Sequence, residues 1–314
     1  MALHPQIQQA LKAMAEAKVR PVEDLSPTEA REQMEAMMRA RAKAVPQVEV
    51  GRIEAREIPG PAGAMPARVY WPKAGGAKLP VVLYFHGGGH VIGSLDTHDA
   101  SARALCAGAE AIVVSLDYRM GPEHRFPAAV DDSWAALRWL HANAASLGAD
   151  PARLAVAGDS AGANLAAVVA LLARDAGGPA IRLQVLIYPV ADYALTGDSF
   201  KRYATGYGVL TSKAMDWFKS YYLNSPEEAA DFRASPIRAK SLAGVAPAFV
   251  ITAECDVLRD DACRFAEALG KAGVAVSHKE YAGMIHGFFG MAPAIDGAVE
   301  AQRDACAALK RAFA

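Results

Sequence analysis

Residues 158–162 have the sequence Gly-Asp-Ser-Ala-Gly, between an apolar run at 154–157 and a helix-prone run at 163–172. The pentapeptide alone is only a glycine-flanked turn. Between a strand and a helix it becomes a nucleophile elbow, because the sharp turn holds the serine hydroxyl clear of the backbone. The flanking glycines leave room for that turn, since they lack a Cβ atom. We therefore predict that Ser160 is a nucleophile.

A nucleophilic serine also needs hydrogen-bond donors for an oxyanion. Residues 80–85 predict a buried strand, and the loop that follows is His-Gly-Gly-Gly at 86–89. This pattern after a strand is typical of the oxyanion loops of lipases and esterases. We expect the donors to be the backbone amides of Gly88 and Gly89, together with that of Ala161 directly after the nucleophile.

Other residues near these motifs are predicted to support the site. The His86 imidazole can hold the glycine loop by hydrogen bonds, and Gly87 gives the loop its freedom. Asp159 points away from the substrate on the tight turn and supports the elbow. His90 follows the loop, at a place from which it could alter the polarity of the acyl pocket.

An acid and a base follow the elbow along the chain. Residues 247–253 predict a core strand with Asp256 just after it, and residues 274–281 predict a short edge strand. That edge strand leads into a loop at 282–288 that contains His286. Open α/β sheets bind their ligands beyond the carboxyl ends of the strands, so both side chains are expected at the site. We predict Asp256 as the acid and His286 as the base.

Each assignment has rivals. For the acid they are Glu254 at the strand end, and Asp260 and Asp261 in the first turn of the next helix, where carboxylates favour the helix dipole. The chain has eight histidines, and only His286 combines a position after the last strand with small neighbours. The others include His278 in a strand, His141 in a helix, and His98 and His124 in polar connecting segments.

The chain resembles the hormone-sensitive-lipase-like group of carboxylesterases, the bacterial family IV esterases. Five stretches carry the resemblance: residues 86–89, 117–129, 158–162, 256–260 and 286–288. It implies an α/β-hydrolase fold, with a mostly parallel central sheet flanked by helices and covered by a helical cap. It also implies a Ser-His-Asp triad that hydrolyses short-to-medium-chain carboxylic esters through an acyl-enzyme. The chain departs from the family pattern at Val257, at Met120-Gly121 and at His90.

The N-terminal part, residues 1–47, is predicted to form cap helices. Leu3, Ile7, Leu11 and Met14 have helical spacing, and Ser26 to Glu29 form a capping box. A second helix carries the stripe Met34, Met37 and Met38. Core packing alone would explain this stripe, but the resemblance favours a place at the substrate entrance.

Residues 48–314 are predicted to form the catalytic core, with a second, aromatic-rich cap segment at about 189–236. Short apolar runs alternate with helical ones, as in a parallel sheet with crossover helices. The predicted strands are 68–71, 81–85, 112–116, 154–157, 183–188, 249–252 and 276–281. The predicted helices include 133–144 and 164–174, and Thr211 or Ser212 is expected to cap another.

The composition argues against nucleic acid and membranes as binding partners. The 314 residues carry a formal charge of −1, without the basic stripe that nucleic-acid binding needs. No apolar run reaches the roughly 18 residues of a membrane span, and the N-terminus lacks a signal-peptide core, so we expect a cytoplasmic enzyme. The four cysteines lack metal-site spacing, and the mechanism needs no cofactor. The expected partner is a small ester, and a homodimer could form through the edge strand between Val274 and Tyr281.

Three other functions share these motifs. A peptidase or amidase could use the same triad, as could an acyltransferase or a lactonase. A binding protein on an inactive hydrolase scaffold, like the gibberellin receptors, would lack a working triad, whereas Ser160 and His286 are both present here.

Overall fold

The computed structural model of the chain describes residues 3–314, and eight strands form one sheet in this part of the chain. Their order is β1-β2-β4-β3-β5-β6-β7-β8, with β1 and β2 antiparallel and all other neighbours parallel apart from β2 and β4. The mostly parallel sheet predicted from the sequence is therefore confirmed. The strands are β1 (Arg52–Gly60), β2 (Gly63–Trp71), β3 (Leu79–Phe85), β4 (Ile112–Leu116), β5 (Ala149–Asp159), β6 (Gln184–Ile187), β7 (Ala248–Cys255) and β8 (Val276–Ile285).

Two strands differ from the prediction. Strand β1 has no counterpart in it, because Ile58 is the only buried residue of the strand and no apolar run marks it. Strand β8 continues to Ile285, so the expected loop from residue 282 is wrong. The final residues of β8 are buried and pair with β7 after a register shift at Ala253–Cys255.

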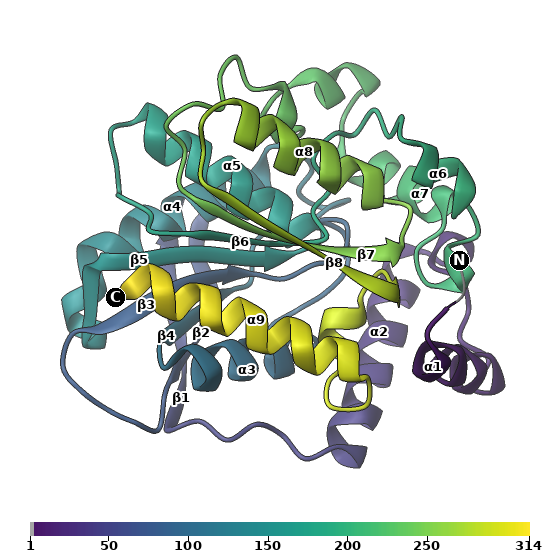
Figure 1. Cartoon of the computed structure of the whole chain (residues 1–314), viewed down its shortest axis with the longest axis horizontal. Coiled ribbons are helices and arrows are strands. Elements are labelled where there is room, and N and C mark those ends of the chain that lie inside the picture. Colours follow the sequence, from purple (N-terminus) through teal and green to yellow (C-terminus); the bar gives the residue numbers. More distant parts are fainter. Residues whose placement is uncertain (1–2) are drawn as a thin grey trace.

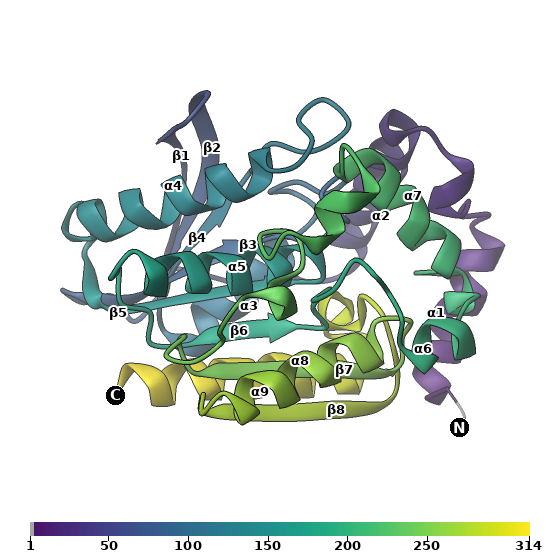
Figure 2. The same ribbon diagram turned by 90° about the horizontal axis from the view of Figure 1, so that it is seen from above.

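Helices cover both faces of the sheet (Figures 1 and 2). On one face lie α4, α5 and α8, and on the other lie α3 and α9. Helix α4 begins at Ala128, earlier than the predicted residue 133. The helices are α1 (Pro5–Glu16), α2 (Pro27–Ala44), α3 (Asp99–Ala109), α4 (Ala128–Asn143), α5 (Ala161–Asp175), α6 (Asp198–Arg202), α7 (Ser212–Tyr222), α8 (Arg259–Lys271) and α9 (Asp296–Phe313).

The remaining helices, α1, α2, α6 and α7, gather beyond the carboxyl ends of the strands (Figure 2). The capping box at Ser26 is present, since its hydroxyl accepts the Glu29 N–H and the Glu29 carboxylate accepts the Ser26 N–H. The N-terminal segment and α7 are in contact, because Trp217 of α7 donates a hydrogen bond to the carbonyl of Leu25, which precedes α2. These helices therefore cover the edge of the sheet at which ligands bind in parallel α/β folds.

One arginine fastens α2 to the core. The Arg31 guanidinium donates to the carbonyls of Val91 and Gly121 and pairs with the Glu123 carboxylate at 2.7 Å. These bonds join the N-terminal segment to the loops beside β3 and β4, so α2 has a fixed position over the sheet edge.

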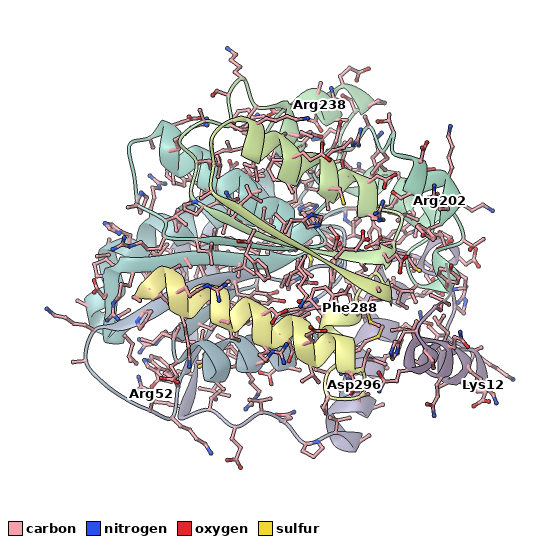
Figure 3. All side chains as sticks on the ribbon, in the orientation of Figure 1. Lys12, Arg52, Arg202, Arg238, Phe288 and Asp296 are labelled. Carbon is pink, nitrogen blue, oxygen red and sulfur yellow. The ribbon has the colours of Figure 1, made fainter. Side chains whose placement is uncertain are left out.

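The core is continuous on both sides of the sheet. Strands β3 and β4 are almost wholly buried, and Phe288 lies fully buried under α9 (Figure 3). Charged side chains such as Lys12 and Arg202 project outward in the same view. Among the described residues, no helix has both the length and the apolar character needed to cross a membrane.

Candidate active site

Ser160 lies on the turn between β5 and α5, with φ 55° and ψ −118°. A non-glycine residue in such a conformation costs on the order of 1–3 kcal/mol and persists only where its surroundings hold it. Here the Ser160 N–H donates to the Ile187 carbonyl at 2.8 Å. A Cβ atom at Gly158 would collide with the backbone of Gly162, and one at Gly162 would collide with the Phe85 carbonyl. The glycines are therefore required because the turn packs directly on β3.

The structure brings Ser160, His286 and Asp256 together from three elements. His286 Nε2 lies 2.9 Å from Ser160 Oγ, and His286 Nδ1 lies 2.7 Å from Asp256 Oδ2. The Asp256 side chain is buried, and its other oxygen accepts the Leu258 N–H at 2.9 Å. Because a carboxylate only accepts hydrogen bonds, Nδ1 carries the proton and Nε2 is left to accept from the serine.

Three backbone amides beside Ser160 are free. Gly88 and Gly89 have φ of 114° and 60°, and Ala161 is the first residue of α5. Within residues 3–314, no hydrogen bond is donated by the N–H groups of these three residues, all of which line the same cavity as Ser160. The amide of Gly87 is different, since it donates to Asp159. The N-terminus of α5 also favours negative charge at this point.

Asp159 is a buried acceptor behind the elbow. Its Oδ1 accepts the Tyr84 hydroxyl at 2.6 Å, and its Oδ2 lies 3.5 Å from His98 Nε2. Burial raises the pKa of Asp159, but the charge and hydrogen bond of His98 and the hydrogen bond from Tyr84 outweigh it and leave that pKa below its usual value. His98 lies in the connecting segment before α3, as predicted, but its side chain is buried and lines the cavity. No local sequence signal marks this contact.

His86 lies behind the glycine loop. Its Nδ1 is 2.8 Å from the Gly87 carbonyl, and its ring stacks on Tyr118 at a centroid distance of 4.4 Å. Burial lowers the pKa of His86 to about 3, so its imidazole is neutral near pH 7. These contacts suit the supporting position expected for this residue.

His90 does not line the cavity, so it has no direct contact with the acyl pocket. The side chain is fully buried, stacks on Tyr222 at 3.9 Å and has Nδ1 2.9 Å from the Tyr193 hydroxyl. Burial lowers the pKa of His90 to about 3. It is Tyr193 that lines the cavity.

The rival acids bind backbone amides instead of His286. Asp260 accepts the Ser199 N–H at 2.8 Å, and Asp261 accepts the Ala191 N–H at 2.6 Å. Glu254 accepts the Gly283 N–H at 2.7 Å. His278, a rival base, has Nε2 2.9 Å from the Thr252 hydroxyl. Each of these rival side chains therefore makes a hydrogen bond to a neighbouring segment and not to His286 or Ser160.

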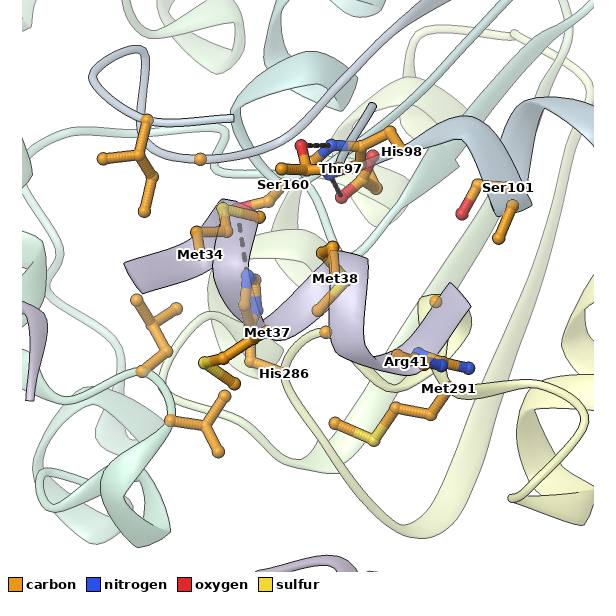
Figure 4. Close-up of a pocket in the computed structure, with 18 of the residues that line it drawn as sticks. Met34, Met37, Met38, Arg41, Thr97, His98, Ser101, Ser160, His286 and Met291 are labelled. Atoms are coloured by element: carbon orange, nitrogen blue, oxygen red, sulfur yellow. Dashed lines mark hydrogen bonds and ion pairs between the residues drawn. The ribbon is translucent and has the colours of Figure 1, made fainter. Parts of the chain in front are cut away.

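A cavity of about 710 Å³ contains Ser160 and His286 (Figure 4). The methionine stripe of α2 forms part of its wall, as the resemblance favoured. Of the aromatic residues in the second cap segment, Tyr193 and Phe218 line it. The methionines of the wall are Met14, Met34, Met37, Met38, Met215 and Met291. Flexible thioether side chains adapt to ligands of different shapes, and together these residues make the cavity predominantly apolar.

Known proteins have sequences similar to this one. A family model described as alpha/beta hydrolase fold matches residues 82–290. Carboxylesterase NlhH of Mycobacterium tuberculosis is 49% identical over 253 residues, which cover 79% of each chain. Ethyl acetate hydrolase of Pseudomonas putida is 41% identical over 239 residues, or 75% of each chain.

Known structures share the fold. A hyperthermophilic esterase from the archaeon Pyrobaculum calidifontis superposes with a TM-score of 0.94 at 42% identity, with 100% of both chains covered. The sheet, the elbow and these similarities lead to one assignment. The chain belongs to the alpha/beta hydrolase family, in its hormone-sensitive-lipase-like group of carboxylesterases.

Proposed function

We propose that this carboxylesterase cleaves short-to-medium-chain esters through an acyl-enzyme on Ser160. The observation that carries the proposal is the unbroken series of hydrogen bonds from Asp256 through His286 to Ser160, beside three free amides. Acyl transfer to serine needs those parts: a nucleophile, a base, a group that orients the base, and donors for the oxyanion.

In the first half-reaction Ser160 Oγ attacks the ester carbonyl while His286 Nε2 takes the hydroxyl proton. The amides of Gly88, Gly89 and Ala161 donate to the oxygen that becomes negative, and Asp256 stabilises the imidazolium. The tetrahedral intermediate then breaks its bond to the alkoxy oxygen. His286 gives that oxygen the proton, the alcohol leaves, and the acyl group stays on Ser160.

The second half-reaction repeats these steps with water. His286 takes a proton from water as its oxygen attacks the acyl carbonyl, and the same amides hold the second oxyanion. The bond to Ser160 Oγ breaks, His286 returns the proton to the serine, and the carboxylic acid is released.

The proposed acyl length rests on the resemblance to the hormone-sensitive-lipase-like carboxylesterases, and the cavity has room for such esters. Its volume of about 710 Å³ lies within the range of roughly 300–1,000 Å³ common for small-molecule sites. A series of p-nitrophenyl esters from acetate to palmitate tests this. We expect the highest kcat/KM at short-to-medium chains, and a maximum at palmitate would contradict the proposal.

The deciding experiment compares the hydrolysis of p-nitrophenyl butyrate by the native protein and by Ser160→Ala. Ser146→Ala is the matched control, because Ser146 is exposed, lies in the turn after α4 and does not line the cavity. We expect turnover in the native protein and the control, and none in Ser160→Ala, with equal circular dichroism. Equal turnover in Ser160→Ala would disprove the assignment, and inactivity of all three folded proteins would favour a binding scaffold.

Two structural parts of the proposal concern the cap and the dimer. We propose that residues 1–47 and about 189–236 act together as the cap, since both segments contribute to the cavity wall. The homodimer through the edge between Val274 and Tyr281 stays a prediction. Strand β8 ends the sheet, and an edge strand can pair with a second copy or remain blunted. Light scattering after size-exclusion chromatography distinguishes the two.

A further inference from the structure

We propose that Arg41 binds a carboxylate at the far end of the ester, so that this enzyme favours esters carrying an anionic group. The inference rests on the proposed function and names its substrate class. Arg41 is a charged residue in a cavity wall that is largely apolar.

Arg41 lies in the last turn of α2 and is half-buried. Its Nη2 donates to the Ala292 carbonyl at 2.5 Å. A guanidinium has five N–H donors, and this is the only hydrogen bond that the side chain makes within residues 3–314. None of the ion pairs formed in that range includes Arg41. The side chain is held in place with most of its donors unused.

The other charged groups of the wall already have partners. Arg20 pairs with Glu29 at 3.5 Å. Arg68 pairs with two of the aspartates of the wall, Asp96 at 2.6 Å and Asp99 at 3.2 Å. The third, Asp159, is bonded to Tyr84 and Gly87. Within residues 3–314, Arg20, Asp96 and Asp99 of the wall have ion-pair partners and Asp159 accepts two hydrogen bonds, whereas Arg41 has no partner of opposite charge.

An unpaired cation in such a place favours an anionic ligand. Burial lowers the pKa of Arg41, which means that its surroundings disfavour the charge it carries. A carboxylate would relieve that cost, and the planar guanidinium can bind both carboxylate oxygens at once.

The position of Arg41 sets the shape of the ligand. In Figure 4 it lies beside Met291, on the far side of Met38 from Ser160. The apolar side chain of Met38 therefore lies on the wall between the nucleophile and the cation. This arrangement fits an ester with an apolar spacer that ends in a carboxylate, carried on either the acyl or the alcohol part.

Two pairs of esters separate those two forms. For the acyl part, mono(4-nitrophenyl) adipate is compared with 4-nitrophenyl 6-methylheptanoate, in which an isopropyl group replaces the carboxylate. For the alcohol part, 4-carboxyphenyl butyrate is compared with 4-isopropylphenyl butyrate. The measured quantity is the ratio of kcat/KM for the charged ester to that for its neutral partner.

We expect Arg41→Gln to lower that ratio about tenfold or more for one of the pairs, because charge-assisted hydrogen bonds are roughly twice as strong as neutral ones. Arg41→Lys should lower it less, and added salt should lower it in the native protein. Lys43→Gln is the matched control, since it removes the same charge from an exposed residue of α2 outside the cavity wall. Its ratios should equal those of the native protein.

Equal ratios in the native protein and in both folded Arg41 variants, for both ester pairs, would overturn the inference. That result leaves the proposed function intact, because the neutral esters are still hydrolysed. In this experiment the proposed function fails if the native protein hydrolyses none of the four esters.

Discussion

The carboxylate of Asp159 accepts the N–H of Gly87 at 3.1 Å. The residue before the nucleophile thus holds the first glycine of the oxyanion loop, although 72 positions separate them in the chain. The same oxygen accepts the Tyr84 hydroxyl from the strand that leads into the loop. The elbow and the loop are therefore fixed to each other by one buried side chain.

Replacing Asp159 by asparagine should loosen this connection. The neutral amide accepts more weakly from Gly87 and Tyr84, and its NH₂ group cannot accept at all. We expect kcat for p-nitrophenyl butyrate to fall about tenfold while KM changes little, because the loop amides act mainly on the oxyanion. Asp175→Asn, at an exposed residue, serves as the control. A kcat equal to that of the native protein would contradict this account.

Asp256→Asn should lower kcat by about 10⁴, as in other Ser-His-Asp enzymes, since an amide no longer fixes the His286 tautomer that accepts from Ser160. Steady-state kinetics on p-nitrophenyl butyrate measure the loss. The comparison with Asp260→Asn is informative, because Asp260 is a rival acid in the sequence but binds the Ser199 backbone in the structure. A larger loss in Asp260→Asn than in Asp256→Asn would mean that the acid is misassigned.

Gly89→Ala tests the close approach between the oxyanion loop and α7. A Cβ atom at Gly89 would collide with the Phe218 ring, and its φ of 60° costs an alanine about 1–2 kcal/mol. We expect kcat/KM to fall at least about tenfold, because the loss of one oxyanion donor typically lowers kcat by about 10²–10³. The double variant with Phe218→Ala should recover part of the loss, because the collision is gone. Losses that simply add in the double-mutant cycle would show that the two residues do not interact.

The buried histidines predict a stability that falls in acid. His86 and His90 have folded-state pKa values of about 3, against 6.5 in an unfolded chain. Between these values the unfolded chain binds more protons than the folded protein, so the free energy of unfolding is fully present above pH 6.5 and decreases as the pH falls. Each histidine contributes a slope of up to about 1.4 kcal/mol per pH unit.

Urea unfolding between pH 7.5 and pH 5 measures that slope. His90→Phe keeps an aromatic ring against Tyr222 and should reduce the slope by about one proton. His124→Gln, at an exposed histidine, should leave it unchanged. An unchanged slope in His90→Phe would mean that His90 is protonated in the folded protein.

Elements with apolar runs between glycines and prolines could be predicted from the sequence. Strand β4 has the predicted bounds, Ile112–Leu116, because all of its residues are buried. Strand β1 could not be predicted, since it is stabilised by pairing with β2 and only Ile58 is buried. Burial of the end of β8 likewise depends on contacts with distant parts of the chain.

The same distinction applies to the site. The motifs around Ser160, Asp256 and His286 predict residues that the structure brings within hydrogen-bond distance of one another. The positions of His98 and Arg41 have no local signal. Each depends on tertiary contacts, of His98 with Asp159 and of Arg41 with Ala292.

One part of the cavity wall and the base come from opposite ends of the chain. Helix α2 supplies Met34, Met37 and Met38, whereas His286 follows β8, the last strand of the sheet to leave the ribosome. During synthesis the nucleophile is therefore exposed long before its base is available. The nascent chain has no means to activate Ser160 until β8 has joined β7, so hydrolysis begins only when the sheet is complete.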